Sequence, residues 1–220
     1  MCKNISIILS GGVGIRFGNE MPKQYQMLLG EEVIAYVVGA LKQSTFTGRL
    51  LIVARTDDME RLKTAYGVDC APAGETHNGS IKNALDYIQA NFSVCANVLF
   101  VDAARPFLTA DTVDKYYNFL KEYDGVITAQ HITDSLGFKE EMFVDRSHYF
   151  LIQKPEAFRF APLYSCFTRE SSVTAIVQQM PPGSKIMKCF DIRQNLKITY
   201  PEDLSLAEHL MASRLKENYK

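Results

Sequence analysis

The sequence lacks the features that would place it in a membrane or in an oxidising compartment. Its five cysteines are scattered and none forms a C-x-x-C pair, which argues against a disulfide framework or a zinc site. The longest apolar stretch, residues 33–41, is interrupted by Gly39 and is far too short to cross a bilayer. The apolar run at residues 5–9 is too short for the core of a signal peptide. We therefore expect a cytoplasmic protein.

The sequence also has little net charge of either sign. The formal net charge is −1, so the composition gives no electrostatic footprint for nucleic acid or for an anionic membrane. The 220 residues suffice for one domain that buries roughly 70% of its unfolded surface, and no repeat or low-complexity tract divides them. We expect a single domain over residues 1–220 that binds neither nucleic acid nor membrane.

Short apolar runs alternate with amphipathic segments through the first 130 residues. The apolar runs predict strands and the segments of helical periodicity predict helices, one of which has Thr109 as its N-cap. The predicted strands are residues 5–9, 50–54, 97–101 and 126–129, and the predicted helices are residues 33–43, 57–66, 80–90 and 109–123. Such alternation is typical of an α/β fold in which helices cover both faces of a doubly wound, mostly parallel sheet.

The alternation of predicted strands and helices stops after His131. Residues 132–138 and 142–152 look extended and flank the polar tip Lys139-Glu140-Glu141, which predicts a protruding β-arm over about residues 132–152. Beyond the arm we expect helices at residues 156–167, 173–180 and 201–217 and a strand at residues 185–189. The last helix has proline at its first position and acids in its first turn, as helix N-termini favour.

A glycine-rich loop directly follows the first predicted strand. It reads Leu9-Ser10-Gly11-Gly12-Val13-Gly14-Ile15-Arg16-Phe17-Gly18, and Lys23 follows in Met21-Pro22-Lys23-Gln24-Tyr25. Glycines let a backbone approach phosphate oxygens closely and point successive N–H groups at them. Arg16 adds a cation whose forked donors suit phosphate. A glycine loop with two cations is what a triphosphate needs.

Other glycine motifs fit this loop less well. A dinucleotide-binding fingerprint would need glycine where Phe17 stands, and a P-loop needs a Gly-Lys-Ser/Thr element that is absent. A turn that uses glycine only for its backbone angles remains an alternative, but it leaves Arg16 and Lys23 unexplained.

Asp102 and Arg105 lie where an open α/β sheet binds its ligands. They belong to Val101-Asp102-Ala103-Ala104-Arg105-Pro106-Phe107, at the carboxyl end of a predicted strand. Asp102 could hold a divalent cation or a substrate hydroxyl, with Arg105 orienting it. A purely structural Asp–Arg pair is the alternative.

Two more polar segments stand at predicted helix starts. Lys197 lies in Asn195-Leu196-Lys197-Ile198-Thr199-Tyr200-Pro201, which reads as a strand feeding the last helix, and a helix N-terminus favours anions. An isolated lysine is usually only solvated, which is the alternative. The loop Gly74-Glu75-Thr76-His77-Asn78-Gly79-Ser80 opens another helix, and alone it is only a loop.

Together and in this order, the segments resemble one family over nearly the whole chain. It is the cytidylyltransferase family that includes the 2-C-methyl-D-erythritol 4-phosphate and ribitol-5-phosphate cytidylyltransferases. Its pattern is a glycine loop with Arg, Pro-Lys-Gln, Gly-Gly-x-x-Arg-x-x-Ser/Thr, His-Asp-Ala-x-Arg-Pro, an arm with Asp-Thr, and Asn-x-Lys-x-Thr-x-Pro-x-Asp-Leu. The resemblance implies a Rossmann-like nucleotidyltransferase fold, CTP as substrate and Mg²⁺ as cofactor. It also implies transfer of CMP to an alditol phosphate, with release of pyrophosphate, in a homodimer built by the arm.

The same resemblance implies residue roles. The residues implied for CTP are Leu9, Ser10, Gly11, Gly12, Val13 and Gly14 at the triphosphate and ribose, Gly74, Glu75 and Ser80 at the cytosine, and Asp102 with Arg105 near the ribose and the metal. The implied catalytic cations are Arg16, Lys23, Arg146 and Lys197. The residues implied for the acceptor are Ser135 and Arg146 from the arm of a neighbouring subunit, together with Lys154, Lys197 and Thr199.

Departures from the family pattern fall mainly on the acceptor side. His77 stands where the family usually has Arg, and Val101 stands where His usually precedes Asp102. Gln153-Lys154-Pro155-Glu156 replaces Gln-Thr-Pro-Gln, so that Lys154 would add a positive charge beside the acceptor. Residues 172–175 replace an acidic Thr-Asp-Asp/Ala element.

Three functions stay open at this point. Leu9-Ser10-Gly11-Gly12 and Arg105-Pro106-Phe107-Leu108-Thr109 look like the polyol branch of the family, which favours ribitol 5-phosphate or a similar pentitol phosphate as acceptor. The alternative acceptor is 2-C-methyl-D-erythritol 4-phosphate. A degenerate protein that binds CTP without turnover is the third possibility, and the retained Arg16, Lys23 and Lys197 count against it.

Overall fold

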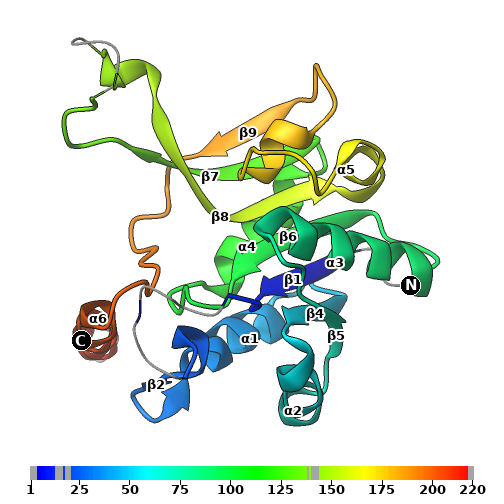
Figure 1. The fold of residues 1–220 in the computed structure, drawn as a ribbon. Coiled ribbons are helices and arrows are strands. Elements are labelled where there is room, and N and C mark those ends of the chain that lie inside the picture. The colour runs from blue at the N-terminus through cyan, green and yellow to red at the C-terminus, as the bar shows by residue number, and fades with distance from the viewer. Residues whose placement is uncertain (1–3, 13–16, 18–20, 138, 140–143, 218–220) are drawn as a thin grey trace.

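The computed structural model describes residues 4–12, 17, 21–137, 139 and 144–217, and its centre is a seven-stranded sheet (Figure 1). In spatial order the strands are β5 (Asp69–Pro72), β4 (Arg49–Ala54), β1 (Asn4–Leu9), β6 (Asn97–Asp102), β8 (Phe150–Arg159), β7 (Gly125–His131) and β9 (Ile186–Cys189). Neighbouring strands are parallel except at β8, which is antiparallel to both β6 and β7. The predicted mostly parallel sheet is confirmed.

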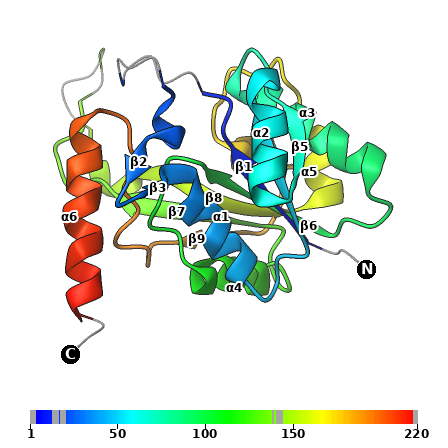
Figure 2. The ribbon, with the colours of Figure 1, turned by 90° about the horizontal axis from the view of Figure 1, so that it is seen from below.

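Helices cover both faces of this sheet (Figures 1 and 2). The helices α1 (Val33–Gln43), α2 (Thr56–Tyr66) and α4 (Ala110–Phe119) pack on one face, and α3 (His77–Asn91) and α5 (Phe160–Cys166) pack on the other. In the central strand β1, Ile7 and Ile8 are fully buried in opposite layers, because successive side chains of a strand point to opposite faces. The doubly wound arrangement is therefore confirmed.

A smaller core joins the C-terminal helix to the main body. Helix α6 (Glu202–Glu217) lies apart from the other helices (Figure 2). Its Ala207 shares a buried cluster with Leu28 of the short hairpin β2 (Met27–Leu28) and β3 (Glu31–Glu32), and with Phe107 and Ile198. This cluster fixes the segment before α6 against the end of β6.

The connection between β7 and β8 projects from the body at the upper left of Figure 1. The two strands pair from Gly125 with Phe158 to His131 with Phe150, so the antiparallel pairing lies mostly outside residues 132–152, where the arm was predicted. The described residues between them contain a short 3₁₀-helix, η3 (Arg146–His148), rather than the predicted extended segments before Phe150. The arm is thus mostly loop, and residues 138 and 140–143 lie outside the described residues.

Two predicted helices of the C-terminal half are wrong in part. Residues 156–159 continue β8, because Glu156, Ala157 and Phe158 pair with β6 on one side and β7 on the other; the helix starts only at Phe160. Residues 173–180 contain only a single 3₁₀-turn, η4 (Ile176–Gln179). Among the described residues, no helix combines the length and apolar character needed to cross a membrane.

Candidate active site

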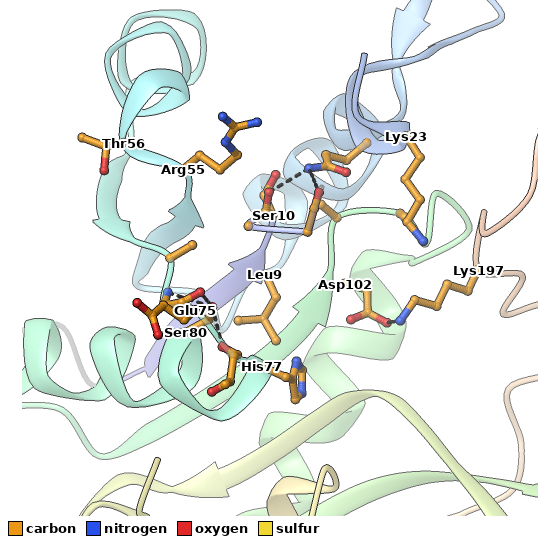
Figure 3. Close-up of a pocket in the computed structure, with 18 of the residues that line it drawn as sticks. Leu9, Ser10, Lys23, Arg55, Thr56, Glu75, His77, Ser80, Asp102 and Lys197 are labelled. Carbon is orange, nitrogen blue, oxygen red and sulfur yellow. Dashed lines mark hydrogen bonds and ion pairs between the residues drawn. The ribbon is translucent and has the colours of Figure 1, made fainter. Parts of the chain in front are cut away.

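A cavity of about 820 Å³ opens where strands β1, β4, β5 and β6 end (Figure 3). Because these four strands are parallel, their carboxyl ends meet at one edge of the sheet, which is where open α/β sheets bind ligands. The lining residues are Leu9, Ser10, Gly11, Gly12, Lys23, Gln24, Arg55, Thr56, Asp57, Ala73, Gly74, Glu75, Thr76, His77, Ser80, Asp102, Ala103, Ala104, Lys197 and Thr199. The four segments singled out in the sequence therefore converge on one cavity.

The start of the glycine loop forms one wall and is held from behind by Gln24. The buried Gln24 amide donates from Nε2 to the carbonyl oxygens of Ser10 (2.8 Å) and Gly12 (3.0 Å). A Cβ at Gly11 would lie 2.4 Å from the Cβ of Ala73, so any other residue at this position would have to displace Ala73. Lys23 precedes Gln24 and lines the same cavity. The predicted residues Val13, Gly14 and Arg16 lie outside the described residues.

Asp102 stands at the end of β6 between two cations. Its Oδ2 accepts a hydrogen bond from Arg105 Nε at 3.0 Å and lies 3.0 Å from Lys197 Nζ, as the dashed line in Figure 3 shows for Lys197. Burial alone would raise the pKa of this carboxyl, but the charges of Lys197 and Arg105 outweigh it and lower the pKa well below its usual range. Asp102 is therefore ionised, and it aims the Lys197 ammonium at the cavity.

The loop before α3 forms another wall. The Ser80 hydroxyl accepts a hydrogen bond from Gly74 N (3.0 Å) and donates to the carbonyl oxygen of Thr76 (3.1 Å). A Cβ at Gly74 would lie 2.5 Å from the carbonyl carbon of Gly79, so the loop closes tightly on the helix start. Glu75 is exposed in the cavity beside it. The Ser80 hydroxyl thus holds the loop together through these two hydrogen bonds. Its predicted role is to bind the cytosine.

His77 faces the cavity as a neutral group. Its side chain is exposed to the open cavity, but the surrounding walls exclude part of its water. This desolvation, together with the positive charges of Lys154 and Lys197, lowers the pKa of the imidazole to about 4. The position where the family usually has arginine therefore carries no charge at neutral pH.

Sequence reasoning missed two contributions to this site. Arg55, Thr56 and Asp57 line the cavity from the start of α2, and they follow β4 directly. The rule that singled out Asp102, a polar residue at the carboxyl end of a central strand, would have found them. Gln24 was quoted only as part of a motif, and no pattern in the sequence reveals that its amide supports the glycine loop.

The predicted acceptor residues are only partly brought together. Lys197 and Thr199 line the cavity. Ser135 and Arg146 are exposed on the β7–β8 connection, where Arg146 donates to the carbonyl oxygen of Thr133, and neither lines the cavity of its own chain. Lys154 does not line it either.

Lys154 differs from the expectation that it adds a free positive charge beside the acceptor. It is 7% exposed, and its Nζ is paired with Oε2 of Glu156, which is 1% exposed. Two departures from the family pattern, at 154 and 156, thus form one buried ion pair. The pair as a whole carries no net charge, although the Lys154 ammonium helps to lower the pKa of His77.

A magnesium ion fits this site through Asp102. No group of three or more His, Cys, Asp or Glu side chains in the described part of the chain is arranged to hold a metal ion by itself. Nucleotide-bound Mg²⁺ needs only one or two protein carboxylates, because phosphate oxygens and water supply its other ligands. The ionised carboxylate of Asp102 on the cavity wall meets that need.

The sequence and the fold of this chain are similar to those of known cytidylyltransferases. The family model described as 2-C-methyl-D-erythritol 4-phosphate cytidylyltransferase matches residues 5–213. The chain is 30% identical to the enzyme of that name from Clostridium beijerinckii, over 94% of this chain and 97% of that one, and 28% identical to that of Cereibacter sphaeroides, over 94% and 96%. The solved 4-diphosphocytidyl-2C-methyl-D-erythritol synthase of Anaerococcus prevotii superposes with a TM-score of 0.81 at 22% identity, covering 96% of each chain.

These relatives do not support the expected closeness to the ribitol branch, since their names all refer to methylerythritol. The resemblance noted in the glycine loop and after Arg105 rests on a few residues, whereas the family model extends over almost the whole chain. The chain belongs to the 2-C-methyl-D-erythritol 4-phosphate cytidylyltransferase family.

Proposed function

We propose that this protein transfers CMP from CTP to 2-C-methyl-D-erythritol 4-phosphate and releases pyrophosphate. The observation that carries the proposal is the convergence of the glycine loop, Lys23 and the Asp102–Lys197 pair on one cavity. Family membership supports the choice of donor and acceptor. The acceptor expected first, ribitol 5-phosphate, becomes the comparison substrate.

The reaction needs no protein nucleophile. An oxygen of the acceptor phosphate attacks the α-phosphorus of CTP, the bond from that phosphorus to the bridging oxygen breaks, and pyrophosphate leaves with the electron pair. Catalysis then depends on holding the two phosphates in line and on stabilising the negative charge that develops. Lys23 and Lys197, two of the cations that line the described cavity, supply that positive charge. Gln24 keeps the glycine loop in place.

Asp102 would hold Mg²⁺ together with phosphate oxygens of the nucleotide. The ion, when bound, neutralises charge on the phosphate groups. Arg105 and Lys197 keep the carboxylate ionised, as its lowered pKa indicates. Asp102 also orients Lys197 through Oδ2.

The acceptor site would include a second copy of the chain. Ser135 and Arg146 are exposed and lie outside the cavity of their own chain. Tyr149 and Leu151, at the base of the same connection, are 54% and 49% exposed. An arm with exposed apolar side chains favours a homodimer in which each arm completes the neighbour's acceptor site.

Pyrophosphate release tests the proposed function. The protein is incubated with CTP, Mg²⁺ and either 2-C-methyl-D-erythritol 4-phosphate or ribitol 5-phosphate, and the product is identified by mass spectrometry. We expect turnover with the methylerythritol acceptor, and much less when ATP or GTP replaces CTP. Faster turnover with ribitol 5-phosphate would contradict the acceptor assignment. Binding of CTP without turnover of either acceptor would support the degenerate binding protein instead.

A further inference from the structure

The segment that carries Lys197 belongs to no helix or strand, so contacts outside regular structure have to fix it. One of them is the hydrogen bond from Ile198 N to the carbonyl oxygen of Ala104, at 2.9 Å. It joins the segment to the end of β6, beside Asp102. The buried side chain of Ile198 holds the segment at the same point. Both contacts lie on the C-terminal side of Lys197, so the position of Lys197 also depends on an attachment on its N-terminal side.

Asn195 supplies that attachment and connects three parts of the chain. Its Nδ2 donates to the carbonyl oxygen of Lys154 and to Oε1 of Gln153, both at 2.8 Å. Its own carbonyl oxygen accepts a hydrogen bond from Arg105 Nη1 at 2.6 Å. Both N–H bonds of the amide therefore hold β8, while its backbone holds Arg105.

The contacts continue from Arg105 to the reacting centre. Arg105 Nε donates to Asp102 Oδ2, and the same oxygen pairs with Lys197 Nζ, each at 3.0 Å. Starting at β8, the path runs through Asn195, Arg105 and Asp102 to Lys197, two residues along the chain from Asn195. Asn195 itself does not line the cavity. Its contribution is therefore exerted through other residues.

We propose that Asn195 is a positioning residue that sets the placement of Lys197 and Asp102 for phosphate transfer. Asparagine suits the position because it offers two donors in one plane to two acceptors on β8. Aspartate has the same shape but no donor, so Asn195→Asp places a carboxylate against two oxygen atoms. The kinetic part of this inference rests on the proposed function; the placement of Lys197 does not.

The test compares Asn195→Asp with Asn97→Asp as a matched control. Asn97 is also a partly buried asparagine, whose Nδ2 donates to Asn4 Oδ1 at 2.9 Å, but it lies at the opposite end of β6 from Asp102. We expect Asn195→Asp to lower kcat on the order of 10²-fold, the loss that a small misplacement of a reacting group produces. KM for CTP should stay nearly unchanged, and Asn97→Asp should keep the wild-type kcat.

A second readout needs no turnover. Trace acetylation of the intact protein, followed by peptide mass spectrometry, measures how fast the Lys197 amine reacts relative to the exposed Lys121. We expect faster labelling of Lys197 in Asn195→Asp than in the wild type or in Asn97→Asp, because Lys197 loses its fixed contact with Asp102. If the wild-type protein shows no turnover, the proposed function is wrong. The labelling rate of Lys197 still tests whether Asn195 positions that lysine.

Two results would overturn the inference. One is labelling of Lys197 at the wild-type rate in Asn195→Asp, and the other is an equal loss of kcat in both asparagine variants. If Asn195→Asp does not fold, Gln153→Ala replaces it, since it removes one of the two acceptors and leaves the backbone contacts. It should change both readouts in the same direction by a smaller factor, and wild-type values in both would also overturn the inference.

Discussion

Several charged residues in this site and near it are paired with other charges. One carboxylate oxygen of Asp102 serves both Arg105 and Lys197, and Lys154 is occupied by Glu156. Lys23 lines the cavity from a short 3₁₀-helix, η2 (Lys23–Tyr25), and its side chain is only partly buried. Removing one such charge therefore affects either the chemistry or the fold, depending on its burial.

Lys23→Ala should lower kcat on the order of 10²–10³-fold, the usual loss when one donor to transition-state charge is removed. The protein should stay folded, because the side chain is not part of the core. Steady-state kinetics with CTP and circular dichroism check both points, and Lys121→Ala, at an exposed lysine outside the cavity, serves as the control. A change confined to KM would make Lys23 a binding residue only.

Lys154→Thr should destabilise the fold by about 3–5 kcal/mol, because it leaves the buried Glu156 charge without its partner. The double variant Lys154→Thr/Glu156→Gln removes both charges and should recover most of that loss. Urea denaturation of the two variants and the wild type measures the free energies of unfolding. If the single variant is as stable as the wild type and only KM for the acceptor changes, Lys154 contacts the acceptor after all.

His77 makes the folded state sensitive to mild acid. Its pKa is about 4 in the folded protein against an ordinary 6.5, so between these values the unfolded chain binds a proton that the folded chain does not. The free energy of unfolding therefore falls as pH decreases through this window. His77→Asn should show a shallower fall, measured by urea denaturation at several pH values. Parallel curves for variant and wild type would show that the imidazole keeps an ordinary pKa.

At the scale of elements, packing between neighbours decided what local patterns left open. Residues 156–159 have a helical pattern in the sequence but form the end of β8, since two flanking strands take up their backbone hydrogen bonds. Strand β5 (Asp69–Pro72) was not predicted, because four residues that include Asp69 and Pro72 show no strand signal of their own. It forms by pairing with β4. Tertiary hydrogen bonding outweighs weak local preference in both cases.

The turn after β1 offers a test of this close packing. Gly11→Ala places a Cβ 2.4 Å from the Cβ of Ala73, so the ends of β1 and β5 have to separate, at a cost of about 1–3 kcal/mol. We expect lower stability and weaker CTP binding, measured by urea denaturation and calorimetry. Gly39→Ala, in α1 with nothing within 4 Å of the added Cβ, should be neutral or stabilising. Equal effects of the two variants would contradict this account.

At the scale of the whole molecule, the described residues of the β7–β8 connection are exposed or only partly buried. Tyr149, Leu151 and Phe190 are 54%, 49% and 38% exposed near its base. We expect a homodimer that covers these side chains, and Leu151→Asp should shift it towards monomer, measured by analytical ultracentrifugation. A wild-type protein that sediments as a monomer at micromolar concentration would contradict the prediction.

Most of the fold and about half of the residues that line the cavity could be predicted from the sequence. Helix α1 and the N-cap Thr109, whose hydroxyl accepts from Thr112 N, were predicted correctly because their signals are local. The segments of the glycine loop, Gly74–Ser80, Asp102 and Lys197 were also found, because ligand-binding residues follow strands at one edge of a parallel sheet. Periodicity and position along the chain suffice for such features.

The tertiary structure alone decided how these residues act on one another. It paired Lys154 with Glu156 instead of leaving a free cation, placed Asn195 between β8 and Arg105, and put Gln24 behind the glycine loop. Each of these contacts joins segments brought together by folding, or depends on which face of a strand is buried. The sequence by itself determined which chemical groups are available and near which strand ends they stand. The packing determined which charges are neutralised and which point into the cavity, because burial and partner geometry set the energy of a charge.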